Sequence, residues 1–136
     1  MIDCEHFFDG WKGNREYALD IARTAYESGA RWVVLCDTNG GTLPHEIETI
    51  VSDISKIVPG THLGIHTHND TEQAVANTLA AVRAGCRQIQ GTLNGLGERC
   101  GNANLCSIIP SLELKLGLAA LPEGKLRQLR ETARFV

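Results

Sequence analysis

The sequence alternates short runs rich in β-forming residues with longer amphipathic runs, and this alternation constrains the fold more than any other feature. The pattern repeats about every 30 residues, so the chain contains four similar units. The candidate strands are Ile2 to Phe8, Arg31 to Cys36, His62 to Ile65 and Arg87 to Leu93. Strands that alternate with helices in this way are predicted to be parallel, with right-handed crossovers. Two architectures remain, an open doubly wound sheet and a closed barrel.

Residues typical of helix starts occur between these strands. Asn14 opens the first helix, Pro44 stands at the start of the second, and Thr71 followed by Glu72 opens the third. The third helix has a nearly continuous apolar surface that is suited to packing on a sheet. Its expected outer face holds Gln73, Asn77 and Arg83. The last stretch, 121–136, is predicted to be an amphipathic helix.

Every candidate strand ends in a polar or glycine-rich cluster. The four clusters are Glu5-His6 to Gly10, Asp37-Thr38-Asn39-Gly40, His66-Thr67-His68-Asn69-Asp70 and Asn94-Gly95. An open sheet concentrates its chemistry at one switch point, whereas the top face of a (β/α)₈ barrel collects residues from many strand ends. The pattern therefore favours an α/β fold in which four parallel βα units make half of a barrel.

Charge and hydrophobicity argue against several classes of protein. The formal net charge is −3 and no cluster of lysines or arginines is longer than two, so no basic surface for nucleic acid or an anionic membrane is expected. No apolar stretch approaches the roughly 20 residues of a membrane-spanning helix, and the first residues lack the pattern of a signal peptide. The five cysteines form no Cys-x-x-Cys pair, which is typical of free thiols in a reduced compartment. We expect a cytoplasmic protein with a small, soluble partner.

The most specific local signal is the pair His66 and His68. Residues i and i+2 of a strand point to the same side, so the two imidazoles converge on one point. Two histidines completed by oxygen donors suit a divalent cation such as Zn²⁺ or Mn²⁺. A hydrogen-bonded histidine pair without metal is the alternative.

A glycine-rich loop follows the fourth strand, Gly95-Leu96-Gly97-Glu98-Arg99-Cys100-Gly101-Asn102. Its glycines allow a ligand to approach the backbone, and the start of the next helix, expected near Ala103, favours anions. A tight connection between strand and helix is the simpler interpretation. Asn102 is then only the residue that caps the helix.

Two further candidates lie at the ends of the first and second strands. Glu5 is either a catalytic base or an ion-pair partner inside the barrel. Thr38, with the neighbouring Asp37, either binds a polar substrate or belongs to a turn that Asn39-Gly40 would form in any case.

Four segments taken together resemble the 2-isopropylmalate, homocitrate and citramalate synthase family in order and spacing. They are Asp3-Cys4-Glu5-His6-Phe7-Phe8-Asp9-Gly10, Leu35-Cys36-Asp37-Thr38-Asn39-Gly40-Gly41, Gly64-Ile65-His66-Thr67-His68-Asn69-Asp70 and Gly95-Leu96-Gly97-Glu98-Arg99-Cys100-Gly101-Asn102-Ala103. The resemblance covers roughly residues 2 to 117, and the first segment is most similar to the bacterial citramalate synthase branch. The combination of His-x-His with Gly-Glu-Arg-x-Gly-Asn is far more specific than either motif alone.

The resemblance implies a TIM barrel of which these units are strands five to eight. Residues 1–117 are then half of the catalytic barrel, and 118–136 begin a helical segment after it that is truncated here. It implies that His66 and His68 ligate a divalent cation (Zn²⁺, Mn²⁺ or Mg²⁺) and that Asn102 is a further ligand or a neighbour of the metal. It also implies that Glu5 is an active-site carboxylate and that Thr38 contacts the carboxylate of a 2-oxo acid.

The reaction implied is a Claisen-type condensation of acetyl-CoA with a 2-oxo acid, in isoleucine, leucine or related biosynthesis. Pyruvate, giving citramalate, is the first expectation, and 2-oxoisovalerate and 2-oxoglutarate follow it. The full-length enzyme is expected to be a homodimer. This sequence lacks the Asp-Arg-Glu-type motif of the family's first strand, so its metal site is incomplete, and we expect weak or no activity from this chain alone.

Two alternatives remain at this point. One is a carbon–carbon lyase or aldolase on a related barrel, such as hydroxymethylglutaryl-CoA lyase; the cysteine loop of that enzyme is not evident before Asn102, because Cys100 lies inside the motif Glu98 to Gly101. The other is a half-barrel without catalysis that associates with itself or with a complementary chain through the unpaired edges of its first and last strands.

Overall fold

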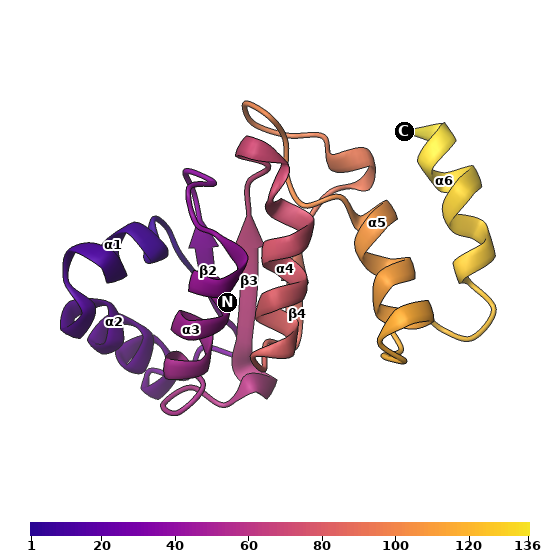
Figure 1. Ribbon diagram of the computed structural model, residues 1–136. Helices are drawn as coiled ribbons and strands as arrows, with labels where there is room; N and C mark the ends of the chain where they lie inside the picture. Colours follow the sequence, from indigo (N-terminus) through magenta and orange to yellow (C-terminus); the bar gives the residue numbers. More distant parts are fainter.

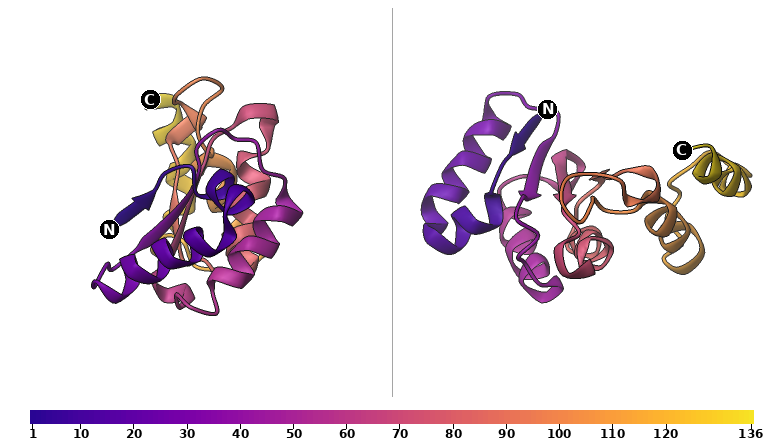
Figure 2. Two further views of the ribbon diagram at one scale, coloured as in Figure 1. Left: turned by 90° about the vertical axis from the view of Figure 1, so that its left-hand side faces the viewer. Right: turned by 90° about the horizontal axis from the view of Figure 1, so that it is seen from above.

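The four candidate strands form one parallel sheet whose strand order follows the chain. The computed structural model describes residues 1–136 and places the strands in the order β1-β2-β3-β4. Figure 1 labels β2, β3 and β4, and β1 is seen beside β2 in the view from above in Figure 2. They are β1 (Ile2–Cys4), β2 (Val33–Asp37), β3 (Leu63–Thr67) and β4 (Gln88–Gln90). All three pairings are parallel, as predicted. β1 and β4 each pair on one side only and are the edges of the sheet.

Helices follow each strand and lie along one side of the sheet. They are α1 (Phe7–Gly13), α2 (Arg15–Glu27), α3 (Pro44–Ile54), α4 (Ala74–Arg83), α5 (Leu105–Pro110) and α6 (Leu129–Phe135). Viewed from above, the helices form an arc around the outside of the strands, and α6 stands beyond α5, away from the sheet (Figure 2). Asn14 and Pro44 begin α2 and α3 as the sequence predicts; the Oδ1 of Asn14 accepts a hydrogen bond from the backbone N–H of Tyr17 at 3.1 Å.

The main hydrophobic core lies between the sheet and α1 to α4. Leu35 of β2 and Ile65 of β3 are neighbours in register, are fully buried, and belong to the same apolar cluster as Ile47 of α3 and Ala81 of α4. Because side chains alternate along a strand, this cluster takes every second residue and leaves the others to the opposite face. That inner face carries His66, whose neighbours in register are Cys36 and Gln90.

The sheet is strongly curved toward its inner face. β1 and β4 are three strand spacings apart, which is about 14 Å in a flat sheet. Nevertheless, the Nε2 of Gln90 on β4 donates a hydrogen bond of 2.9 Å to the Oδ1 of Asp3 on β1. Curvature of this kind brings the edge strands toward each other and is what closure of a barrel requires.

Several sequence predictions about element boundaries are wrong. The fourth candidate strand ends at Gln90 and does not reach Leu93, where a short 3₁₀ helix begins. Phe7 and Phe8 are buried in α1 and do not continue β1, because His6 has a φ of 54° and ends the extended segment. The third helix begins at Ala74, because Thr71 and Glu72 also have positive φ values. In the stretch 121–136, regular α-helix is confined to Leu129–Phe135.

The outer face predicted for the third helix also needs correction. Asn77 is fully buried in α4, where its Nδ2 donates to the carbonyl oxygen of Thr42 at 2.6 Å. A polar side chain that bonds to the loop before α3 can lie on the inner side of the helix, which periodicity alone does not reveal. No helix is both long enough and apolar enough to cross a membrane.

Candidate active site

The two histidines of the His-x-His motif lie together where β3 ends. Their ring centroids are 5.1 Å apart and the rings are inclined at 59°. His66 is half-buried within β3, while His68 follows the strand and is only 7% exposed. The structure therefore brings together the pair that the sequence predicts, on the inner face of the sheet.

His66 is held by a side chain of the neighbouring strand. Its Nδ1 lies 2.8 Å from the Oε1 of Gln90, whose Nε2 donates to Asp3 as described above. An amide oxygen only accepts hydrogen bonds, so Nδ1 of His66 must carry the proton. The Nε2 of the neutral ring then has a free lone pair, which is the form of histidine that binds a metal.

His68 has the opposite arrangement. Its Nδ1 lies 2.8 Å from the Nη2 of Arg99, and a guanidinium only donates hydrogen bonds. Nδ1 of His68 is therefore the acceptor, and the proton of the neutral ring lies on Nε2. Nε2 of His68 can hold a cation only after Arg99 gives up this contact.

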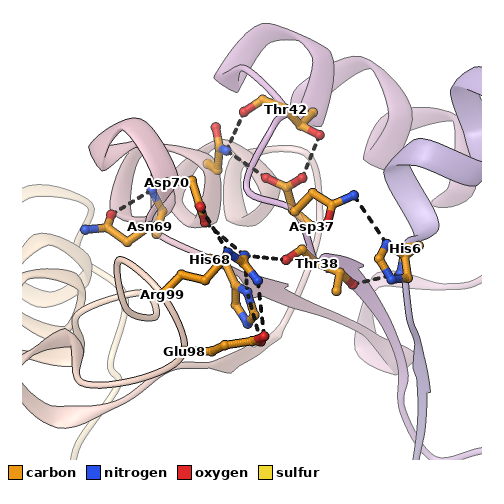
Figure 3. Close-up of polar contacts among 12 residues, drawn as sticks. His6, Asp37, Thr38, Thr42, His68, Asn69, Asp70, Glu98 and Arg99 are labelled. Carbon is orange, nitrogen blue, oxygen red and sulfur yellow. Dashed lines mark hydrogen bonds and ion pairs between the residues drawn. The ribbon is translucent and has the colours of Figure 1, made fainter.

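Arg99 ties three strand ends together (Figure 3). Its Nε and Nη2 donate to the carboxylate of Asp70 at 3.0 Å each, and Nη2 also donates to the carbonyl oxygen of Thr38 at 2.7 Å. These hydrogen bonds from the Arg99 guanidinium lower the pKa of Asp70, and the same pairing raises the pKa of Arg99. Arg99 thereby fixes the glycine-rich loop over His68.

Asn102 lies beside His68 and has an oxygen without a partner. The two residues form an antiparallel bridge, flanked by hydrogen bonds from the N–H of Asn69 to the oxygen of Gly101 and from the N–H of Ala103 to the oxygen of Thr67. This is the closely spaced type of pair, in which facing side chains lie on the same side. The Oδ1 of Asn102 is buried without a hydrogen bond.

The simpler interpretation of Asn102 as a helix cap is wrong. α5 begins at Leu105 rather than near Ala103, and its cap is Asn104, whose Oδ1 accepts from the N–H of Cys106 at 2.9 Å. Asn102 is thus free of that role. Its unpartnered Oδ1 is therefore available to a ligand, and the buried Oδ1 of Asn77 and Oε1 of Gln88 are likewise without a partner.

Glu5 and Thr38 meet at the ends of β1 and β2. The Oγ1 of Thr38 donates to the Oε2 of Glu5 at 2.8 Å and accepts from the N–H of His6, also at 2.8 Å. Glu5 is exposed and Thr38 is half-buried. The two candidates therefore form one unit, in which the Thr38 hydroxyl is already engaged.

Asp37 belongs to the support of the site and does not face a substrate, which corrects one expectation. Its side chain is buried, accepts from the hydroxyl of Thr42 at 2.8 Å and lies 3.4 Å from the Nδ2 of Asn77. Burial raises the pKa of Asp37. This network joins the end of β2 to α3 and α4.

The donor set fits a divalent cation in part. The free Nε2 of His66 and the unpaired Oδ1 of Asn102 are suitable donors, and His68 becomes one when Arg99 moves. No group of three His, Cys, Asp or Glu side chains converges in the chain, so a carboxylate ligand is missing from this set.

Sequence reasoning did not single out Asp3, Gln90, Asp70 or Arg99 as separate residues. Asp70 and Arg99 were noted only within longer motifs. Gln90 had one detectable signal: it follows Gln88 at i+2 in a strand, so both amides lie on one face. Its partners Asp3 and His66 are 87 and 24 residues away, and that separation hides the contact in a linear sequence.

The fold and the site define a class of protein. A parallel βα sheet with imidazole, amide, hydroxyl and carboxylate groups at the carboxyl ends of its strands is the architecture of α/β enzymes whose active site lies at that edge. Within this class, the chain belongs to the HMGL-like family, which matches residues 4–136.

Curated relatives agree with the predicted resemblance. The chain is 59% identical over its whole length to (R)-citramalate synthase of Aquifex aeolicus, of which it covers 26%, and 54% identical to that of Geobacter sulfurreducens, again over its whole length and 26% of the relative. A 2-isopropylmalate synthase of Cronobacter sakazakii is 44% identical over 73% of the chain and 20% of the relative. The chain thus spans about a quarter of the length of the citramalate synthases.

Solved structures show the same fold. An HMG-CoA lyase of Bacillus subtilis matches 88% of the chain and 41% of its own length with a TM-score of 0.77 and 25% identity. An HMG-CoA lyase of Acinetobacter baumannii, solved with coenzyme A and 3-methylmalate, matches 89% of the chain and 41% of its own length with the same TM-score and 23% identity.

Proposed function

We propose that residues 1–117 are strands five to eight of a (β/α)₈ barrel and that 118–136 begin a helical segment after it, in a synthase that condenses acetyl-CoA with a 2-oxo acid. The observation that carries this proposal is the 59% identity to an (R)-citramalate synthase over all 136 residues. Pyruvate is therefore the first substrate to test, before 2-oxoisovalerate and 2-oxoglutarate. The whole enzyme is proposed to be a cytoplasmic homodimer.

Three residues of this chain are proposed to hold a divalent cation. Nε2 of His66 and Oδ1 of Asn102 are free in the structure, and His68 joins them once Arg99 releases its Nδ1. Such a cation supplies Lewis-acid polarisation of the ketone of the 2-oxo acid. The ligand that completes the set is proposed to come from the first half of the barrel.

Glu5 and Thr38 are proposed to act on the two substrates. Glu5 is an exposed carboxylate at the rim, where it is a candidate base for a methyl proton of acetyl-CoA. The Thr38 hydroxyl is proposed to bind the carboxylate of the 2-oxo acid, for which it must turn away from Oε2 of Glu5. When Thr38 binds the 2-oxo acid, the carboxylate of Glu5 then loses its hydrogen bond and becomes free to act as a base.

The metal assignment is tested by the metal content of the protein made from the complete reading frame that encodes this chain. His66→Ala, His68→Ala and Asn102→Leu are each expected to lower the bound divalent metal. His45→Ala is the control, because His45 is exposed in the first turn of α3. Equal metal content in all variants would reject the assignment.

The reaction is tested with the same complete protein by the release of CoA from acetyl-CoA. Release is expected with pyruvate and a divalent cation and not without the 2-oxo acid. Equal release in the absence of the acid would reject condensation. The same reading frame is expected to encode an Asp-Arg-Glu-type strand upstream.

A lyase is the second candidate function, because the fold matches two HMG-CoA lyases. It predicts cleavage of hydroxymethylglutaryl-CoA and no condensation of pyruvate. The half-barrel module without catalysis predicts a stable dimer and no turnover with either substrate. Its structural basis is the pair of edge strands β1 and β4, each free on one side.

A further inference from the structure

We propose that Gln90, anchored by Asp3, is a positioning residue that holds His66 in the tautomer able to ligate a cation, an inference that rests on the metal site proposed above. The contacts run in one line across the inner face. Nδ1 of His66 lies 2.8 Å from Oε1 of Gln90, and Nε2 of Gln90 lies 2.9 Å from Oδ1 of Asp3.

The direction of each hydrogen bond follows from the chemistry of Asp3. An ionised carboxylate has no proton to donate, so the amide nitrogen of Gln90 must face it. The amide oxygen of Gln90 then faces His66 and requires a proton on Nδ1. One carboxylate on β1 thus determines the tautomer of a ring on β3 through a side chain on β4.

The backbone makes this line of contacts specific to His66. His66 and Gln90 are paired in register, which places their side chains next to each other on the inner face. Gln88 lies on the same face of β4, two residues before Gln90, opposite Gly64. Its Oε1 is buried without a hydrogen bond, so Gln88 orients no histidine.

The neighbouring histidine provides an internal contrast. His68 accepts from Arg99 and therefore carries its proton on Nε2, whereas His66 carries its proton on Nδ1. Two histidines two residues apart are thus assigned opposite tautomers. Before any metal binds, His66 is ready and His68 is not, and Gln90 is the residue that makes the difference at His66.

The test uses ¹⁵N NMR of the histidine rings in the metal-free protein from the complete reading frame. Wild type is expected to show Nδ1–H for His66 and Nε2–H for His68. Gln90→Met, which keeps the size of the side chain and removes both hydrogen bonds, is expected to shift His66 toward the Nε2–H form. Gln88→Met is the matched control and leaves His66 unchanged.

A paired exchange separates positioning from packing. In Asp3→Asn combined with Gln90→Glu the net charge is unchanged, the new amide donates and the new carboxylate accepts from His66. This double variant is expected to restore the Nδ1–H tautomer. An unchanged His66 tautomer in Gln90→Met would overturn the proposal, and so would an exchange that does not restore Nδ1–H.

Binding of Mn²⁺ alone, measured by calorimetry, gives the second readout. Loss of a partner of this kind weakens metal binding about 10- to 100-fold, so Gln90→Met is expected to bind Mn²⁺ that much more weakly than wild type and Gln88→Met. Equal affinities would overturn the role of Gln90. Absence of Mn²⁺ binding by wild type would reject the proposed metal site, and the NMR result would still decide whether Gln90 orients His66.

Discussion

Arg99 and Asp70 face each other as a fork and a carboxylate, joined by two hydrogen bonds of 3.0 Å each. The same guanidinium reaches Nδ1 of His68 and the carbonyl oxygen of Thr38. One side chain therefore fixes the glycine-rich loop to the ends of β2 and β3 and also decides where the proton of His68 lies. The contact by which Arg99 holds the loop also keeps the proton of His68 on Nε2. His68 therefore cannot offer Nε2 to a cation while this contact is in place.

Arg99→Lys is predicted to loosen the loop even though the charge is kept. A lysine ammonium is a single point charge and cannot replace a planar fork that serves four acceptor atoms on three residues. The N–H of Asn69, bonded to the oxygen of Gly101, and the N–H of Gly101, bonded to the oxygen of Glu98, are expected to exchange hydrogen faster. Hydrogen exchange read by NMR provides the measurement.

Arg83→Lys is the control, because it makes the same arginine-to-lysine change at a surface site away from the loop. Arg83 pairs with Glu48 between two exposed side chains on α4 and α3, so Arg83→Lys is expected to leave the loop amides unchanged. Identical exchange at Asn69 and Gly101 in wild type and Arg99→Lys would show that Arg99 does not hold the loop.

Asp70→Asn is predicted to remove a pH-dependent part of the stability. Hydrogen bonds from Arg99 lower the pKa of Asp70 in the folded protein. A lowered pKa stabilises the fold at pH values above the unfolded value of about 3.9, and this contribution is lost as pH falls through the folded pKa. The difference in urea midpoint between wild type and variant should therefore be constant near neutrality and shrink toward zero below about pH 4.

The difference between wild type and Asp70→Asn reports on Asp70 because the other carboxyl groups contribute equally to the stability of both proteins. Glu46 and Asp53 also have lowered pKa values, but they are the same in both proteins. A difference in midpoint that does not change between pH 7 and pH 3 would mean that Arg99 does not stabilise the ionised form of Asp70.

Gly101→Ala is predicted to destabilise the protein more than Gly64→Ala. Gly101 has a φ of 102°, and a methyl group there meets the backbone oxygen of Gly95, which cannot move aside. The expected cost is about 1–3 kcal/mol. A methyl group at Gly64 meets the Oε1 of Gln88, the end of a flexible side chain, and lies 3.0 Å from the Cγ2 of Val34, so a cost of about 1 kcal/mol, at the lower end for overpacking, is expected. Urea unfolding of both variants measures the order, and equal or reversed costs would contradict it.

The cysteines are predicted to separate into reactive and inert groups. Burial raises the pKa of Cys4 to about 11 and those of Cys36 and Cys86 to about 12; charges on Glu5 and Asp3 add to the effect at Cys36. At pH 8 a thiol with a pKa near 12 is ionised in roughly one molecule in ten thousand, and only the thiolate reacts. Cys100 is exposed and should react first.

Thiol titration with a chromogenic disulfide at pH 8 checks this order. One rapid equivalent is expected from Cys100 and a slower one from the half-buried Cys106, and the other three should react only after unfolding. Cys100→Ser should remove the rapid equivalent. Rapid reaction of three or more thiols in the folded protein would show that the core opens readily.

The fold was predictable because its signals are local. Alternation of strands and helices, a cap at Asn14 and a proline at position 44 each depend on a few adjacent residues, and the structure has them in place. Phe7 and Phe8 were assigned to a strand because two adjacent apolar residues look the same in a buried strand and a buried helix. The positive φ of His6, which ends the extended segment and separates the two cases, is not visible in the hydrophobic pattern.

The site was predictable only in part, for a physical reason. His66 and His68 share a face because they are two residues apart, which the sequence displays directly. The partners that set their tautomers, Gln90 and Arg99, lie 24 and 31 residues further along the chain. Such contacts depend on strand register and on sheet curvature, which arise from packing of the whole sheet.

The order of the strands in the sheet governs the order in which the site can form. Because each strand pairs with the next one in the chain, a nascent polypeptide adds every new strand to an edge that already exists. The hydrogen bond between Gln90 and Asp3 differs, because it spans 87 residues and must wait for the fourth strand. A ribosome-bound chain that ends before Gln90 therefore contains both histidines but not the residue that orients the first of them.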